Sequence, residues 1–227
     1  MLTNERQISA LANAEDFRAK IQQIEFTCVG AKSALARGSL LLINARNITA
    51  SWNDLEIHRK LLEWSIAFGT NSSGLRSLAV IFDAPVRLSE REFEGALWQR
   101  IQSLSDEDHR RGYQVAPRFS GNPDDPHFSL SFGGKAYFVV GLHPEASRPA
   151  RRFARPALVF NPHDQFVRLR EEGGYERMRE TILARDEAFA GSANPMIARH
   201  GEVSEARQYS GRLIEGAWQC PFQDPRK

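Results

Sequence analysis

Apolar residues along this chain gather into five short runs that predict β-strands. The runs at 39–48 and 75–83 are nearly continuous, which is typical of central strands. Three further runs predict strands at 128–132, 136–142 and 157–160. Gly133-Gly134 separates the first two of these three, and it predicts a tight hairpin turn because glycine readily adopts positive φ angles.

Between these runs, apolar residues recur at helical spacing. Helices are predicted over residues 5–24, from Asn53-Asp54 to about Phe68, from Ser89 to about Leu104, and from 162 to about 190. Ser89 and Glu92 form a capping-box pair at the start of the third helix. The expected core-facing residues are Ile8, Leu11, Phe17, Ile21 and Ile24 in the first helix and Leu55, Leu62 and Ile66 in the second.

This order of helices and strands predicts an α/β (α+β) fold. We expect a single domain over residues 1–227, with an N-terminal helical segment at 1–25 and a mixed, largely antiparallel sheet flanked by helices. Apolar residues make up 41% of the chain, which is enough to bury a core without disulfides or a structural metal.

The net charge and the choice of basic residues limit the classes of ligand that this protein is expected to bind. The formal net charge is only +2, which argues against a protein that binds nucleic acid through its overall charge. Of the 30 basic residues, 25 are arginine. This bias suits buried ion pairs or an anionic ligand, and a GC-rich genome produces the same bias.

The cysteines and the start of the chain carry little specific signal. Cys28 and Cys220 lie near opposite ends, so they form neither a disulfide framework nor a CxxC metal motif. A thiolate nucleophile or a thiolate haem ligand stays open for either one. The first 17 residues are polar and charged, and no stretch approaches the roughly 18 apolar residues of a membrane span. We therefore expect a cytoplasmic protein without a membrane partner.

Two histidines follow predicted strands. Asn161-Pro162 predicts the cap and first residue of a helix, and the dipole at this helix start favours a neutral His163 that can ligate iron or zinc. His143 ends the strand 136–142. If residues 143–155 form a crossover, both histidines emerge at one sheet edge, whereas a hairpin pairing sends them to opposite edges. The alternative for each histidine is a local structural role. The other four, His58, His109, His127 and His200, lie in polar surroundings and are expected to be exposed.

A cluster of arginines lies between these two histidines. The cluster places four guanidinium groups within eight residues: Arg148, Arg151, Arg152 and Arg155. Such a cluster can bind phosphate or carboxylate groups, and the alternative is a solvated basic patch. A nucleic-acid groove is the weakest interpretation, because Phe153 is the one aromatic residue inside the cluster.

An aspartate interrupts an apolar stripe near the end of the last long helix. The stripe consists of Tyr175, Met178, Ile182 and Phe189, and Asp186 fills the remaining place at helical spacing. A carboxylate that faces a core must be paired, because an isolated buried charge is costly. The partner of Asp186 is either an arginine of this chain or a cationic substrate. Glu202 and Glu205 are further candidates to receive a cation.

Several segments resemble the YqcI/YcgG family. They are CVGAKSAL (28–35), DDPHFSLSFGG (124–134), VVGLHPEASRPARRF (139–153), VFNPHDQFVRLR (159–170), RDEAFAGSANPM (185–196), SEARQYSGR (204–212) and WQCPF (218–222). The resemblance spans a family core at 26–222, and its most specific part is the C-terminal half. It is closest to the haem-dependent branch, which includes the guanitoxin-pathway N-hydroxylase and an arginine N-hydroxylase of D-cycloserine biosynthesis. Short members often lack the histidines, whereas this chain has both His143 and His163.

The resemblance implies a haem-dependent N-hydroxylase, a monooxygenase that acts on a guanidine or amine nitrogen of a small cationic substrate such as arginine. It implies that haem b is held by His163, with His143 as second choice, while Arg148, Arg151 and Arg152 pair with the propionates. The oxidant is O2 or a peroxide, and Asp186, Glu202 and Glu205 receive the cation.

The electron donor, and the choice between a monomer and a homodimer, do not follow from this resemblance. The alternative function is a haem-free small-anion binding protein, or a haem carrier without oxygenase activity.

Overall fold

The fold is built on one mixed, five-stranded sheet, seen in a computed structural model that describes residues 2–67, 74–196, 201–214 and 216–226. The strands are β1 (Leu40–Asn47), β2 (Ser77–Ala84), β3 (Leu130–Phe132), β4 (Lys135–Leu142) and β5 (Ala157–Pro162). Their order across the sheet is β1-β2-β5-β4-β3. β1 and β2 pair in parallel and the other neighbours pair antiparallel, so the predicted α/β fold with its largely antiparallel sheet is confirmed.

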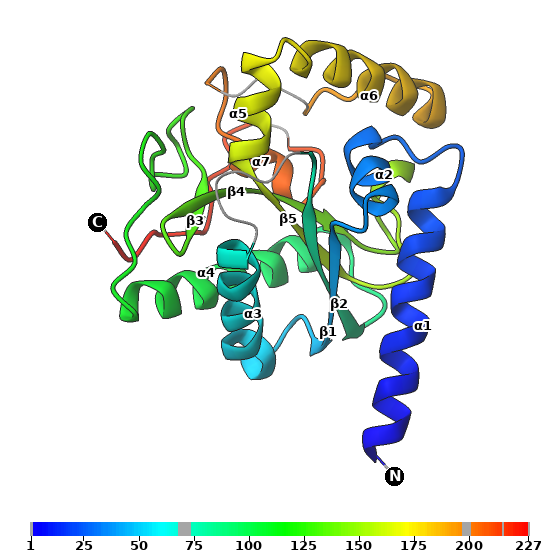
Figure 1. Cartoon of the computed structure of the whole chain (residues 1–227), viewed down its shortest axis with the longest axis vertical. Helices are drawn as coiled ribbons and strands as arrows, with labels where there is room; N and C mark the ends of the chain where they lie inside the picture. Colours follow the sequence, from blue (N-terminus) through cyan, green and yellow to red (C-terminus); the bar gives the residue numbers. More distant parts are fainter. Residues whose placement is uncertain (1, 68–73, 197–200, 215, 227) are drawn as a thin grey trace.

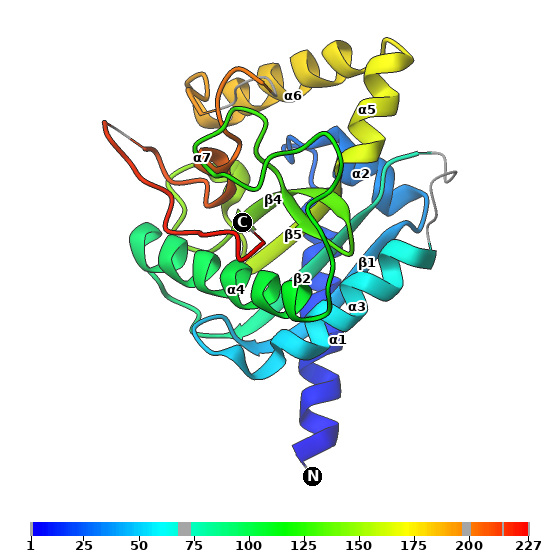
Figure 2. The same ribbon diagram turned by 90° about the vertical axis from the view of Figure 1, so that its left-hand side faces the viewer.

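Helices cover both faces of this sheet. The α-helices are α1 (Leu2–Gln22), α2 (Val29–Ala36), α3 (Asp54–Ala67), α4 (Glu90–Arg110), α5 (His163–Glu171), α6 (Tyr175–Ala190) and α7 (Ala206–Tyr209), and short 3-10 helices span Ser51–Asn53 and Pro149–Arg151. α3 and α4 lie on one face, while α1 and α2 lie on the other (Figures 1 and 2). None of the helices within the described ranges carries an apolar stretch long enough to cross a membrane.

β2 runs through the middle of the apolar core. Its residues from Ser77 to Phe82 are all buried. Alternate side chains of a strand point to opposite faces, so Leu78, Val80 and Phe82 pack with α3 and α4, whereas Ala79 and Ile81 pack with Phe17 and Ile21 of α1. Two cores therefore share one strand, which explains the nearly continuous apolar run in the sequence.

The predicted first helix is present as α1, but the prediction of which residues face the core is partly wrong. Phe17 and Ile21 are buried, whereas Ile8, Leu11 and Ile24 are 61%, 66% and 87% exposed. The N-terminal half of α1 extends past the body of the protein in both views (Figures 1 and 2). In the middle of the helix, the buried side chain of Asn13 donates hydrogen bonds to Asn44 and Asp83 and holds α1 against the sheet by a polar contact.

The buried face of α3 also differs from the prediction. Leu62 is buried as expected, but Leu55 and Ile66 are 60% and 74% exposed. The core side of the helix instead carries Ile57, Leu61 and Trp64. The expected end of this helix, Phe68, lies outside the described residues.

The remaining histidines were expected to be exposed, and this prediction is wrong for His58. His58 is fully buried, and its Nε2 atom lies 2.8 Å from Oδ1 of Asp108. The same carboxylate accepts hydrogen bonds from Arg226 and from the backbone N–H of Gly133. The polar residues next to His58 in sequence point away from this cluster, so local polarity did not reveal it. His109 and His127 are exposed as expected, and His200 lies outside the described residues.

Two helix boundaries were not predicted from the hydrophobic pattern: the end of α5 and the start of α2. The predicted helical region 162–190 is divided into α5 and α6, because Gly173 adopts a φ of +71° that ends α5. α2 was not predicted as a helix. It begins where the Cys28 sulfur accepts a hydrogen bond from the N–H of Ala31.

The pairing of β4 with β5 resolves the two alternatives for the histidines. The strands are antiparallel, with Leu142 opposite Ala157 and Tyr137 opposite Pro162. His143 follows one end of this ladder and His163 follows the other. The two histidines are therefore at opposite ends of the strand pair, as the hairpin alternative requires.

Candidate functional site

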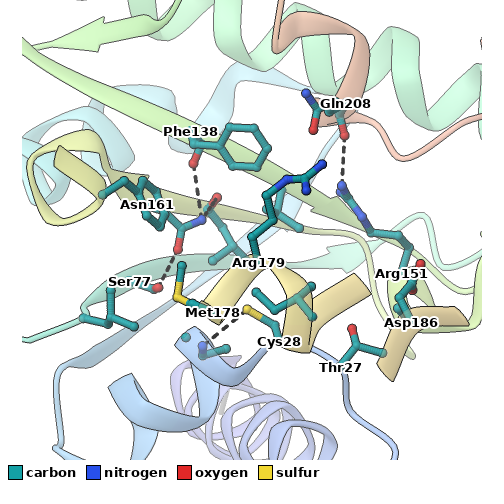
Figure 3. A pocket seen from close by; sticks show the side chains of 18 of the residues that line it. Thr27, Cys28, Ser77, Phe138, Arg151, Asn161, Met178, Arg179, Asp186 and Gln208 are labelled. Carbon is teal, nitrogen blue, oxygen red and sulfur yellow. Dashed lines mark hydrogen bonds between the residues drawn. The ribbon is translucent and has the colours of Figure 1, made fainter. Parts of the chain in front are cut away.

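A cavity of about 280 Å³ lies between the sheet and the helices on its α1/α2 face. Phe138 and Val140 of β4 and Val159 of β5 contribute apolar side chains from the sheet. The opposite wall comes from α6, and the remaining walls come from α1, α2, α5 and α7 (Figure 3). The site therefore gathers residues from Phe17 to Gln208, and apolar atoms dominate its surface.

His163 is a buried residue of the cavity wall. It is 4% exposed and begins α5, where Pro162 takes the cap position without a side-chain hydrogen bond. The predicted cap, Asn161, instead accepts a hydrogen bond from Ser77 at 2.6 Å. The imidazole lies near the rings of Phe119 and Phe166, at centroid distances of 4.9 Å and 5.9 Å.

Glu205 holds this imidazole. His163 Nε2 lies 3.1 Å from Oε1 and 3.0 Å from Oε2 of Glu205, and both side chains are 5% exposed. The hydroxyl of Tyr209 donates a second hydrogen bond to Oε1 of the same carboxylate. Burial, together with the nearby negative charge of Glu205, raises the pKa of Tyr209 well above its usual value, so Tyr209 remains a protonated donor.

Asp186 is paired with an arginine of the same chain. Its Oδ2 atom lies 2.6 Å from Nη2 of Arg148, and Asp186 is the buried residue of α6. Arg148 also donates to the carbonyl oxygen of Ser192 at 2.9 Å. Between the two partners predicted for Asp186, the structure shows the arginine, and both members of this pair line the cavity.

Arg151 also lines the cavity, but its donors are directed at backbone carbonyls. It binds the carbonyl oxygens of Gly141, Gln208 and Tyr209 at 3.1, 3.0 and 3.3 Å. Burial lowers the pKa of Arg151 to about 10, which still leaves it charged at neutral pH. The guanidinium therefore joins the end of β4 to the last carbonyls of α7.

The rest of the arginine cluster lies elsewhere. Arg152 is exposed, does not line the cavity, and donates to the carbonyl oxygens of Ala146 and Ser147. Arg155 donates to the carbonyl oxygen of Asp83. The cluster is therefore divided between the cavity and the surface.

His143 is far from His163 and packs on the other face of the sheet. Its ring stacks on Phe93 of α4 at a centroid distance of 4.3 Å, and it does not line the cavity. Burial lowers the pKa of His143. Glu202 is exposed and is also absent from the cavity wall. The predicted site residues that the structure brings together are His163, Glu205, Asp186, Arg148 and Arg151.

Sequence reasoning missed two arginines of the cavity wall. Arg179 extends from α6 towards Phe138 and Gln208 (Figure 3). Arg170 lies with its guanidinium carbon 4.2 Å from the ring centre of Tyr175. The signal for Arg179 was the predicted apolar stripe beside it on α6, because the side chains at 175, 178 and 182 face this cavity rather than a closed core.

The charged side chains that line the cavity do not balance. Four arginines and two carboxylates contribute, a formal excess of two positive charges: Arg148, Arg151, Arg170 and Arg179 against Asp186 and Glu205. A group with two negative charges would offset this excess.

The cysteines occupy different environments. Cys28 lines the cavity at the start of α2, and its burial raises the pKa of its thiol. Burial also raises the pKa of Cys220, to about 12. Both side chains are therefore thiols rather than thiolates at neutral pH, which weakens the thiolate alternatives.

Comparison with known proteins identifies the family. A sequence profile of the YqcI/YcgG family matches residues 17–223. The chain belongs to the YqcI/YcgG family. The uncharacterised protein YqcI of Bacillus subtilis strain 168 is 33% identical to it over 156 residues, which cover 64% of this chain and 60% of YqcI. The matched region therefore spans less than two thirds of that relative. No solved structure matches this YqcI/YcgG protein.

No metal cluster marks the site. Among the residues that the structure describes, no group of three or more His, Cys, Asp and Glu side chains could hold a metal ion.

Substituting Asp186 tests how much its ion pair with Arg148 contributes to the stability of the protein. We expect Asp186→Asn to lower the free energy of unfolding by about 3 kcal/mol, because it leaves the largely buried charge of Arg148 without its carboxylate. Chemical denaturation would measure this change. Glu187→Gln, at the exposed neighbouring position, is the matched control and should alter stability by about 0.5 kcal/mol or less. Equal effects of the two variants would contradict the assignment.

The lowered pKa of His143 predicts a pH dependence of stability. Burial disfavours protonation of this imidazole in the folded state, whereas the unfolded chain protonates it below its ordinary pKa of 6.5. Acid therefore favours unfolding. The contribution of neutral His143 to the free energy of unfolding decreases as pH falls below about 6.5. The loss of unfolding free energy between about pH 7.5 and about pH 5 should be smaller in His143→Gln than in the wild type, while exposed His109→Gln should match the wild type. An unchanged loss in His143→Gln would refute the expectation.

Proposed function

We propose that this cavity binds haem b, that His163 would hold its iron, and that the protein N-hydroxylates a guanidine or amine nitrogen of a small cationic substrate such as arginine. The resemblance to the haem-dependent branch of the family supplies the reaction class. The observation that carries the proposal is the buried His163 on the wall of a largely apolar cavity, held by the carboxylate of Glu205.

The residues around His163 fit a haem ligand. Histidines that ligate metals commonly donate their other ring N–H to a carboxylate, which fixes the ring orientation and raises the basicity of the ligand. Glu205 supplies such a carboxylate at 3.0 Å. The apolar side chains of Phe138, Val140 and Val159 suit the flat apolar body of a porphyrin. His143 has no part in this proposal, because it lies on the other face of the sheet.

The charges of the cavity fit as well, with a revised choice of arginines. Haem b carries two propionates, which match the formal excess of two guanidinium groups. Arg148 is engaged by Asp186, Arg151 by three carbonyls, and Arg152 lies outside the cavity. Arg170 and Arg179 also line the cavity, and they are the propionate partners that we favour.

The substrate would lie beside the acidic residues of the cavity. Bound haem would supply the oxygen atom that is transferred to nitrogen, from O2 with two electrons of an external donor or from a peroxide without them, and the other oxygen atom leaves as water. Asp186 and Glu205 are the carboxylates that would contact a cation, which would share them with their present partners, Arg148 and His163. The apolar wall excludes water, which strengthens these electrostatic contacts.

A second candidate is a haem-free protein that binds a small anion, or a haem carrier without oxygenase activity. The same excess of positive charge in the cavity favours it. The two functions differ in visible absorption and in turnover, which the following experiments measure.

Protein purified from cells supplied with iron should show a Soret band. His163→Ala should lose this band, because it removes the axial ligand, whereas His143→Ala should keep it. The two variants remove the same group from buried sites on opposite faces of the sheet, so each controls for the other. A colourless wild-type preparation that also fails to take up added haem would rule out the haem proposal.

Turnover separates the oxygenase from the carrier. Haem-loaded protein, incubated with arginine or related guanidines and a reductant under air, should yield a product heavier by one oxygen atom. Mass spectrometry measures this product, and the His163→Ala protein is the control. A haem-loaded protein that yields no oxygenated product from any guanidine or amine would favour the carrier.

A further inference from the structure

We infer that α6 is a lid, a segment that moves to open the cavity. It turns about Gly173-Gly174 and is held closed by the ion pair between Asp186 and Arg148. The lid is a property of the ligand-free protein and holds for any ligand of the cavity, so it does not depend on the proposed function.

α6 covers the cavity without packing into a core. Among its 16 described residues, only Asp186 is buried. Tyr175, Met178 and Ile182 are half-buried and line the cavity wall, where Figure 3 shows Met178. A side chain that borders a cavity lacks contact partners on that side, so these three stabilise the closed position less than a packed core would. Segments with few buried apolar contacts open at a low cost in free energy.

The residues on either side of α6 suit a hinge. Gly173 has a φ of +71°, and Gly174 takes the cap position of the helix. Two consecutive glycines can change φ and ψ over a wide range, because they have no Cβ atom. Gly191, with a φ of +74°, follows the other end of the helix. The chain can therefore bend at both ends of α6 at little steric cost.

One largely buried ion pair holds the C-terminal end of α6. Oδ2 of Asp186 lies 2.6 Å from Nη2 of Arg148, and the two side chains are 4% and 15% exposed. Arg148 also donates to the carbonyl oxygen of Ser192, just beyond the helix. Lys20 of α1 adds a weaker contact, 5.8 Å from the ring centre of Phe189. Opening of the lid must therefore separate Asp186 from Arg148.

Cys28 can report this opening. It lines the cavity from the start of α2, a helix that α6 contacts. Burial raises the pKa of its thiol, and a protonated thiol reacts slowly. We expect a thiol reagent to reach Cys28 only when α6 moves away. Cys220 does not line the cavity and serves as the internal reference.

Labelling of ligand-free protein with iodoacetamide, followed by peptide mass spectrometry, measures the rates at Cys28 and Cys220 separately. Asp186→Asn should accelerate labelling of Cys28 by about tenfold or more, because it leaves Arg148 without its carboxylate in the closed position. The rate at Cys220 should change by less than about twofold, since a local opening of α6 does not expose it.

Glu187→Gln, at the exposed neighbouring position, is the matched control and should leave both rates unchanged. Equal acceleration at Cys28 and Cys220 in Asp186→Asn would indicate global unfolding and would overturn the inference.

Gly174→Ala tests the hinge. Gly174 has a φ of −88°, which alanine adopts readily, and an added Cβ would lie at an ordinary contact distance of 3.4 Å from Leu169 Cδ2. Alanine narrows the range of backbone angles in the open state. Labelling of Cys28 should therefore slow by about twofold to fivefold.

Gly95→Ala in α4, on the other face of the sheet, is the control for this substitution. Its added Cβ would have no neighbouring atom within 4 Å, and the rate at Cys28 should not change. An unchanged rate at Cys28 in either Asp186→Asn or Gly174→Ala would overturn the lid. If Asp186→Asn does not fold, Gly174→Ala decides, because it removes no side-chain contact.

These measurements stand apart from the haem proposal because they use ligand-free protein. A missing Soret band would overturn the proposed function and leave the labelling rates intact. Labelling rates that do not respond to the substitutions would overturn the lid and leave the absorption experiment unaffected.

Discussion

The antiparallel ladder between β4 and β5 determines where His163, Arg148 and Arg151 lie around the cavity. The register sends the chain after Leu142 to one end of the strand pair and brings it back at Ala157. Arg148 and Arg151 lie in that connection, whereas His163 begins the helix at the far end of β5. The cavity lies between these two ends, and α6 carries Asp186 back to Arg148. A shift of one residue in this register would turn Phe138 and Val140 away from the cavity.

Two arginines of the cavity wall join separate elements of the fold. Arg148 joins α6 to the connection after β4, and Arg151 joins α7 to β4. Each uses several donors at once, which lysine, with its single ammonium group, matches less well. These contacts show one structural use of arginine, although composition alone could not distinguish an arginine that joins two elements from one that binds a ligand.

The strands were predictable because burial on both faces of a central strand leaves an apolar run in the sequence. The helices were harder to orient, since Asn13 supports α1 by hydrogen bonds that are invisible in a hydrophobic pattern. In the site, His163 could be singled out because it follows a strand, and Asp186 because it breaks an apolar stripe. Arg179 was indicated only by its place beside that stripe, and Arg152 gave a false signal, because exposure depends on contacts between distant segments. The same limit concealed the burial of His58 against Asp108.

The wall of the cavity includes Phe17 of α1 and Gln208 beside Tyr209 of α7, so the binding site exists only when nearly the whole chain has folded. Contacts between such distant segments form late, because the long intervening loop must close first. A molecule that fills the cavity would connect the beginning and the end of the chain through a single set of contacts. Its binding free energy would then add to the stability of the entire domain rather than to one local element.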